Sequence, residues 1–194
     1  MPSSRRHSDQ AARPEAAPPL LVINGWKIYA HPLFLDQFEE LLHEVEQLRA
    51  GDPAGYREKK KTKLLAAIQK MAFEVIPQNP AHHMFLQGNT LGQPYRHWYR
   101  GKFFDGRYRL FFRFSSNAKA IVLAWVNDAE TLRTYGSRTD AYAVFKAMLG
   151  RNRPPNEWEA LLKEAEAEAP RSKKLWGRPA PKGPASDPCK NPKR

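Results

Sequence analysis

The feature that most constrains this fold is an alternating segment from Arg107 to Phe114, which directly follows Asp105-Gly106. Apolar side chains at every second position predict a strand with one buried face, because successive side chains of a strand point to opposite sides. Asp-Gly favours a two-residue hairpin turn, so another strand should precede it at about 98–104. Ser115-Ser116-Asn117 should turn the chain into a third strand at about 120–126, which gives an antiparallel meander.

The other face of the alternating segment is basic. It carries Arg107, Arg109 and Arg113, with Phe111 among them. A guanidinium is planar, stays charged and can hold two phosphate oxygens at once, and an aromatic ring can stack on a base. This face therefore indicates a nucleic-acid ligand, although Arg107 and Arg113 could instead pair with an acidic protein partner.

Helical periodicity predicts helices on both sides of the meander. A short strand at 26–30 should lead into helices at about 35–50 and 53–76, and a long loop should follow over 77–94. Two more helices should start near Thr139 and at Asn156, the latter as an N-cap. The expected fold class is α+β, a small antiparallel sheet packed with N-terminal and C-terminal helices.

Composition divides the chain into one domain and two tails. Residues 1–19 and 170–194 are rich in Pro and charged residues and are expected to be disordered, which leaves a single domain at 20–169. The formal charge is +12, and 170–194 hold eight Lys or Arg against one Asp. That basic tail either adds nonspecific affinity for RNA or the ribosome, or is simply solvated.

Within the domain, positive charge is concentrated near the meander. Residues 95–138 hold nine Lys or Arg against three acidic residues. A further run, Lys59, Lys60, Lys61 and Lys63, fits a solvated helix face better than a track for phosphates.

Several classes of chemistry are excluded by what the sequence contains. Cys189 is the only cysteine, and His82 and His83 are adjacent rather than at metal-ligand spacing, so no metal site and no cofactor are expected. Glycine-rich phosphate loops and Gly-x-Ser-x-Gly elbows are missing. The sequence has neither an apolar run of about 20 residues nor the apolar core of a signal peptide, so we expect a cytoplasmic protein without a membrane partner.

Cleavage of RNA without a metal fits the remaining residues. The ribose 2′-hydroxyl would attack the adjacent phosphate, which requires a base, an acid and cations that stabilise the transition state. The candidate catalytic residues are Arg109, Tyr135, Arg133, Lys102 and His97, and the candidate RNA contacts are Arg107, Arg113, Arg100 and Arg138.

Among these candidates, Arg109 is the best phosphate clamp because arginine binds oxygens well and carries protons poorly. The acid and base roles fall to His97, Tyr135 or a desolvated Lys102, which the pattern does not distinguish. Structural alternatives stay open for Tyr135, which can pack at the approach to a helix, and for His97 beside Trp98.

Long ordered motifs in this chain resemble the YhaV family of bacterial toxins over residues 22–168. The motifs that carry the resemblance are Asn24-Gly25-Trp26, Tyr29-Ala30-His31-Pro32, Lys63-Leu64-Leu65-Ala66, Gly106 to Arg113, Leu123-Ala124-Trp125, Asn127-Asp128 and Thr131 to Gly136.

The resemblance implies a type II toxin–antitoxin toxin of the RelE-like superfamily, an mRNA-cleaving ribonuclease that stops growth. It also implies a PrlF-type antitoxin with a swapped-hairpin DNA-binding fold, and a complex of the two that binds operator DNA and represses its own operon. The clamp arginine of RelE-like toxins maps to Arg109 and their tyrosine to Tyr135. A further arginine of that superfamily falls at Ala129 here, with Arg133 as the nearest substitute.

Two other functions compete with the ribonuclease. A non-catalytic module could bind nucleic acid through the same arginines, and an inactive protein could use them mainly to meet an acidic antitoxin. Cleavage preference, dependence on the ribosome and assembly into homo-oligomers are left open by the sequence.

Overall fold

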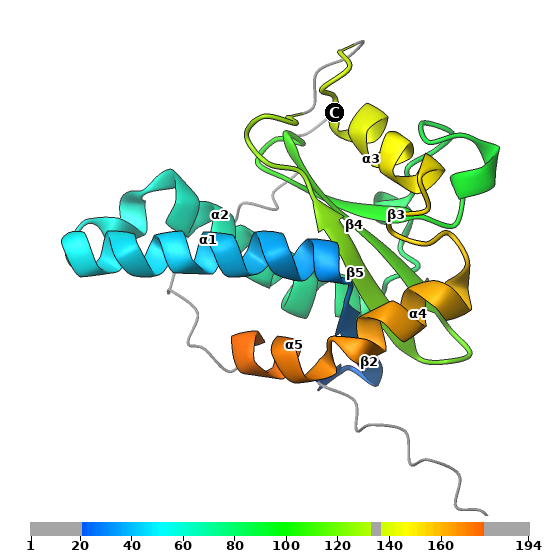
Figure 1. The fold of residues 1–194 in the computed structure, drawn as a ribbon, viewed down its shortest axis with the longest axis horizontal. Helices are drawn as coiled ribbons and strands as arrows, with labels where there is room; N and C mark the ends of the chain where they lie inside the picture. Colours follow the sequence, from blue (N-terminus) through cyan, green and yellow to red (C-terminus); the bar gives the residue numbers. More distant parts are fainter. Residues whose placement is uncertain (1–20, 133–136, 177–194) are drawn as a thin grey trace, which may run out of the picture.

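The computed structural model describes residues 21–132 and 137–176, which form an α+β fold around one five-stranded sheet (Figure 1). The strands lie in the order β1-β2-β5-β4-β3. Their bounds are Val22–Ile23 for β1, Trp26–Ala30 for β2, Tyr99–Phe103 for β3, Tyr108–Ser115 for β4 and Ala120–Val126 for β5. The expected fold class is confirmed, and so is the antiparallel meander of β3, β4 and β5.

The sheet is mixed rather than wholly antiparallel, because β2 pairs with β5 in parallel. Ile28 lies opposite Ile121, and the backbone N–H of His31 donates to the carbonyl of Leu123 over 2.9 Å. Strand β5 is therefore central, with a partner on each side and every residue buried. Its unbroken apolar sequence reflects this position, since strands covered on both faces lack alternation.

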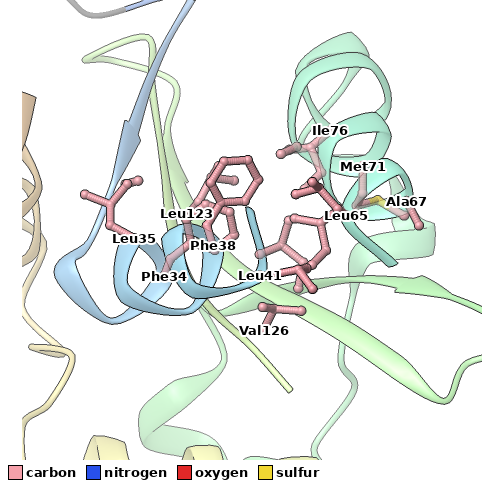
Figure 2. Packing of buried hydrophobic residues seen from close by; sticks show 14 of the residues in the cluster. Phe34, Leu35, Phe38, Leu41, Leu65, Ala67, Met71, Ile76, Leu123 and Val126 are labelled. Carbon is pink, nitrogen blue, oxygen red and sulfur yellow. The ribbon is translucent and has the colours of Figure 1, made fainter. Parts of the chain in front are cut away.

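Helix α1, Pro32–Gly51, covers one face of the sheet (Figure 2). Its N-cap is His31, whose ring Nδ1 accepts from the backbone N–H of Leu33 at 3.2 Å, and Pro32 takes the first helical turn, where no N–H partner is needed. The helix buries Phe34, Phe38 and Leu41 beneath it. This core also includes Leu110 and Phe112 of β4, as the alternation predicted.

The second helix is shorter than expected at its N-terminus. Helix α2 spans Lys60–Lys70 instead of beginning at about 53, and a 3₁₀ turn at Tyr56–Glu58 precedes it. The helical path continues through a π-helical turn, Met71–Val75, and a 3₁₀ turn that contains Pro77. Gly101 of β3 lies against this turn, since a Cβ atom there would sit 2.5 Å from the sulfur of Met71.

Helices α3, Ala141–Gly150, and α4, Trp158–Ala167, cover the other face of the sheet. Phe145 of α3 stacks on Phe111 with ring centres 4.2 Å apart and on Trp125 at 5.6 Å. Phe111 is fully buried here, so it is not an exposed stacking platform for bases. Helix α4 begins one residue later than expected, because its N-cap is Glu157. The side chain of Asn156 instead accepts a hydrogen bond from the indole N–H of Trp98.

A fifth helix corrects the expected C-terminal boundary of the domain. Helix α5, Ala169–Trp176, lies beside α1, whereas a disordered tail from 170 was expected. Leu175 is buried, and Arg171 forms ion pairs with Asp36 at 2.8 Å and Glu39 at 2.7 Å. The domain therefore extends at least to Trp176, and the rest of that expected tail lies outside the described residues, as does the expected tail at 1–19.

Candidate active site

The basic face of β4 is divided among three environments. Arg107, in the turn before β4, is exposed. Arg109 is buried, with only 5% of the residue exposed to solvent, and Arg113 is half-buried. The arginines therefore do not form one continuous exposed surface. A strand rise of about 3.3 Å per residue separates Arg109 from Arg113 by roughly 13 Å, so the two belong to different ends of the sheet.

Arg109 is held by contacts on three sides. Its Nη1 donates to the carbonyl oxygen of Gly106, and its guanidinium carbon lies 5.1 Å from the ring centre of Tyr142. Its backbone N–H donates to Oδ1 of Asn127 over 2.5 Å. Both the backbone and the charged group of this arginine are therefore fixed by neighbours from outside its own strand.

Lys102 lies directly opposite Arg109 in the pairing of β3 with β4. Residues opposite each other in an antiparallel pair project from the same face, so the ammonium and the guanidinium share one side of the sheet. A Cβ atom at Gly106 would sit 3.9 Å from both Arg109 Nη2 and Lys102 Cδ. The hairpin end of β3 and β4 thus brings two of the predicted catalytic cations together around a glycine.

The turn between these strands has the Asp-Gly geometry that the sequence predicted. Asp105 and Gly106 have positive φ angles of 53° and 73°, and the N–H of Arg107 donates to the carbonyl of Phe104 over 3.0 Å. Glycine has little penalty for positive φ, and Asp is among the residues that tolerate it best. The Gly106 carbonyl, which accepts the hydrogen bond from Arg109, is consequently part of a tight turn.

His97 and Arg113 form a separate cluster at the other end of these strands. The guanidinium carbon of Arg113 lies 5.6 Å from the ring centres of both Trp98 and Trp158, and its Nη1 donates to the carbonyl of Asn156. Nε2 of His97 donates to Oδ1 of Asn156 over 2.9 Å. The structure therefore places His97 beside Arg113 and not with Arg109 and Lys102.

Burial affects the protonation of this second cluster. It lowers the pKa of His97 below its ordinary value of 6.5, and the positive charge of Arg113 lowers it further. Burial also lowers the pKa of Arg113. The half-buried guanidinium between two indole rings is typical of a structural arginine that fastens α4 to the sheet.

Arg100, predicted as an RNA contact, is buried. Its Nε donates to the hydroxyl of Tyr142 over 3.0 Å, and its Nη1 donates to the carbonyl of Met84 over 2.6 Å. Only 7% of the residue is exposed, so a direct contact with RNA would require this group to leave the protein interior.

Asn127 is a site residue that sequence reasoning missed. Its Oδ1 accepts from the backbone N–H of Arg109, and its Nδ2 donates to the carbonyls of Arg107 at 3.2 Å and Thr131 at 3.1 Å. The next residue, Asp128, accepts from the backbone N–H groups of Glu130 and Thr131. In the sequence the pair Asn127-Asp128 stands out only as one of the motifs of the family resemblance, because its partners Arg109 and Arg107 lie 18 and 20 positions away.

The remaining predicted site residues are Arg133, Tyr135 and Arg138. Arg133 and Tyr135 lie outside the described residues, and Arg138 is exposed. In the lysine run of α2, Lys59, Lys61 and Lys63 pair with Asp52, Glu44 and Glu58, as expected for a solvated helix face. Over 21–132 and 137–176 we find no group of three His, Cys, Asp or Glu side chains placed to hold a metal ion.

A cavity of about 470 Å³ lies on the opposite side of β4, between α1, α2 and the end of β5. Its apolar lining includes Leu41, Ile68 and Tyr108, and acidic residues such as Glu40 and Asp128 surround it. Lys60, Lys61 and Asn127 also line the cavity, whereas Arg109 and Lys102 do not. The cavity therefore adjoins the candidate site at Asn127 but does not include its two cations.

Comparisons with known proteins agree with the resemblance found in the sequence. Residues 28–166 match a family model described as a toxin with endonuclease activity, of a toxin–antitoxin system. The chain is 50% identical over 145 residues to Ribonuclease toxin YhaV of Escherichia coli strain K12, covering 74% of this chain and 94% of that protein. Proteins named Toxin YhaV from E. coli O157:H7 and O6:H1 match with the same identity and coverage.

No solved structure is significantly similar to this chain. Among the helices in the described part of the protein, none is long and apolar enough to cross a membrane. The family match covers the whole of the sheet from β3 to β5 and therefore includes Arg109 and Lys102. The chain accordingly belongs to the YhaV family, toxins with endonuclease activity that form part of toxin–antitoxin systems.

Proposed function

We propose that this protein is a metal-independent endoribonuclease that cleaves mRNA and thereby inhibits translation and growth. The observation that carries the proposal is that Lys102 lies opposite Arg109 in the strand register, with Gly106 close to both side chains, at the hairpin end of β3 and β4. The name of the E. coli relative supports RNA as the substrate. Two cations on one face are suited to a phosphodiester whose negative charge increases in the transition state.

The proposed reaction is attack by a ribose 2′-oxygen on the adjacent phosphorus. The bond between O2′ and phosphorus forms while the bond between phosphorus and O5′ breaks. The hydroxyl proton passes to a base, and an acid supplies a proton to O5′, so the products end in a 2′,3′-cyclic phosphate and a 5′-hydroxyl. Arg109 carries no proton in this scheme and instead binds the phosphoryl oxygens.

Lys102 is the titratable group that the register brings opposite Arg109, and we assign it a proton-transferring or charge-stabilising role. Tyr135 and Arg133 complete the proposed set from the segment that follows Leu132. His97 is left out of this set because its neighbours are Arg113 and Asn156.

Binding of substrate requires a change at the hairpin turn. Arg109 is 5% exposed, and its Nη1 donates to the Gly106 carbonyl. We propose that a phosphate oxygen replaces this carbonyl as the acceptor, since a charge-assisted hydrogen bond to phosphate is stronger than one to a neutral carbonyl. Exposed Arg107 and Arg138 are then free to contact the flanking RNA or an acidic antitoxin.

The proposed partner is a PrlF-type antitoxin of the swapped-hairpin class, which with this toxin would bind operator DNA and repress their operon in the cytoplasm. Membership of a toxin–antitoxin family supports an antitoxin of some kind. Co-expression with such an antitoxin should restore growth, and the purified complex should shift operator DNA in a gel whereas the toxin alone should not.

The test of the enzymatic proposal uses purified protein and a synthetic RNA in the presence of a metal chelator. We expect cleavage to persist, to yield 2′,3′-cyclic phosphate ends and to stop when the attacking 2′-hydroxyl is replaced by hydrogen. Arg109→Ala should lower the rate by about 10²–10³-fold. Arg49→Ala, at an exposed position in the last turn of α1, is the matched control and should cleave normally.

Two outcomes would contradict this proposal. Cleavage by Arg109→Ala at the normal rate would show that the clamp is misassigned. Salt-sensitive binding of RNA that stays intact after long incubation would instead favour a non-catalytic nucleic-acid-binding protein.

A further inference from the structure

Tyr142 of α3 lies between arginines from two neighbouring strands. Its hydroxyl accepts a hydrogen bond from Nε of Arg100 over 3.0 Å, and its ring centre lies 5.1 Å from the guanidinium carbon of Arg109. Tyr142 itself is 6% exposed. One buried side chain therefore contacts a structural arginine at its edge and the proposed clamp arginine at its face.

The orientation of the Tyr142 ring is fixed by several independent contacts. The backbone N–H of Tyr142 donates to Oδ1 of the helix N-cap Asp140 over 3.0 Å, which sets the first turn of α3. The ring meets Phe111 edge to face, with centres 5.6 Å apart and planes at 86°. On its far side Arg100 is anchored by the Met84 carbonyl. The orientation of the Tyr142 ring is therefore fixed by the protein itself, before substrate binds.

The chemistry of an aromatic face suits the proposed task of Arg109. The face of a phenol ring is electron-rich and attracts a guanidinium, while the N–H groups of the guanidinium point outward in its own plane. A guanidinium restrained in this way holds its N–H groups in one fixed plane, so it loses little freedom when phosphate oxygens replace its present acceptors.

We infer that Tyr142 is a positioning residue that aligns Arg109 for the scissile phosphate, and that buried Arg100 acts through Tyr142 by holding its hydroxyl. This inference rests on the role of Arg109 proposed above. It also gives Arg100 a function that does not require contact with RNA.

Three variants separate positioning from simple packing. Tyr142→Leu removes the aromatic face, Tyr142→Phe keeps the face but removes the acceptor for Arg100, and Phe145→Leu is the control. Phe145 is buried on the same helix and stacks on Phe111, so its truncation damages the same core without touching Arg109. All three are compared at a temperature where each is folded, with cleavage of one synthetic RNA as the readout.

We expect Tyr142→Leu to lower kcat by about tenfold or more, with KM changed less than about threefold, because a desolvated cation–π contact is worth that factor. Tyr142→Phe should lower kcat by a smaller factor of about two to five. Phe145→Leu should lower the melting temperature while leaving kcat unchanged.

A double-mutant cycle tests the part played by Arg100. If Arg100 acts through the Tyr142 hydroxyl, Arg100→Met combined with Tyr142→Phe should lower kcat no more than the worse single variant. Additive losses would overturn the assignment of Arg100. This cycle keeps the inference testable even if Tyr142→Leu does not fold.

The failures of the two proposals give different results. If Arg109→Ala abolishes cleavage but Tyr142→Leu keeps a normal kcat, only the positioning role is wrong. Equal losses of kcat in Tyr142→Leu and Phe145→Leu would likewise overturn it in favour of general packing. If Arg109→Ala cleaves normally, the clamp itself is wrong.

Discussion

At the scale of single residues, the Asn127 amide connects the end of β5 to the candidate site. It accepts from the backbone of Arg109 and donates to the carbonyls of Arg107 and Thr131, and it is 1% exposed. Buried polar groups cost free energy when they lose their partners. The position of Arg109 on its strand therefore depends on a side chain that never needs to meet the substrate.

Asn127→Ala should destabilise the protein by about 2–4 kcal/mol, because it leaves buried backbone groups without partners. Urea unfolding of the variant measures the change in the free energy of unfolding. The control is Asn117→Ala, at an exposed position in the turn between β4 and β5, which should change stability by less than about 0.5 kcal/mol. Equal stabilities of the two variants would contradict the role given to Asn127.

Some contacts of single residues can be predicted from the sequence and others cannot. The convergence of Arg109 and Lys102 follows from the Asp-Gly turn, because the turn fixes which residues of the two strands are opposite. Asn127, Tyr142 and Asn156 could not be found in the same way. Asn127 meets Arg109 from 18 positions away, Tyr142 meets Arg100 from 42, and Asn156 meets His97 from 59. The contacts of Tyr142 and Asn156 form only after helices α3 and α4 pack on the sheet.

At the scale of elements, the basic side of strand β4 and its preceding turn carries both an exposed arginine and an arginine packed within the protein. Arg107 is exposed just before the strand, whereas Arg113 lies between two indole rings and donates to the Asn156 carbonyl. The alternation predicted that both arginines face away from the α1 core, but it could not reveal that α4 covers one of them. Truncation of Arg107 should consequently affect RNA binding, whereas truncation of Arg113 should affect the stability of the fold.

Arg107→Ala should leave the melting temperature unchanged and reduce the salt dependence of RNA binding, with the slope of log K against log salt falling by about 0.7. Arg113→Ala should leave that slope unchanged and destabilise the fold by about 1–3 kcal/mol, because it removes two cation–π contacts and a hydrogen bond. Titrations at several salt concentrations, together with thermal unfolding, measure both effects. A reduced salt slope for Arg113→Ala with normal stability would return this arginine to the RNA surface.

The elements themselves were predictable where their signals are local. Alternation and turn residues located β3, β4 and β5, and the apolar spacing of Phe38, Leu41 and Val45 located α1. The pairing of β2 with β5 was not predictable, since nothing in either segment encodes a partner so far along the chain. Helix α5 was missed because its basic, Pro-containing sequence is stabilised by acidic residues of α1.

At the scale of the whole molecule, α5 closes the side of the core next to α1. Leu175 is buried, Trp176 meets Phe73 with ring centres 5.3 Å apart, and Arg171 bridges Asp36 and Glu39. The C-terminal end of the described chain therefore contributes directly to the same core as the N-terminal helix.

A chain ending at Ala167 should be less stable than the full chain by about 2–4 kcal/mol, because it loses a buried leucine and exposes the core beneath it. A chain ending at Trp176 is the matched control and should unfold like the full-length protein. Differential scanning fluorimetry and urea unfolding distinguish these outcomes. Identical stabilities for both truncations would show that α5 adds nothing to the core.

A buried and a half-buried histidine make the stability of the whole domain depend on pH. Burial lowers the pKa of His31 and of His97 below the ordinary value of 6.5. The unfolded chain therefore binds more protons than the folded chain just below pH 6.5, so stability rises with pH through this range and is lost as the pH falls.

Unfolding free energies measured between pH 5.0 and 7.5 should thus decrease toward acid, and His97→Asn should weaken that dependence. His43→Gln changes an exposed histidine of α1 and is the control, with the pH dependence of the parent. An unchanged pH dependence in His97→Asn would contradict the assigned effect of burial.

The parallel pairing of β2 with β5 also affects how the chain can fold. Ile28 and Ile121 are neighbours in the sheet but are separated by about 90 residues, so closing this contact has a large entropic cost and is slow compared with forming the local hairpin. A chain still growing from its N-terminus cannot complete the sheet until β5 has been synthesised, and Asn127, which fixes Arg109, comes directly after that strand. The protein therefore acquires its proposed phosphate clamp only late in its own synthesis, and a nascent chain that stops before β5 cannot hold Arg109 in place.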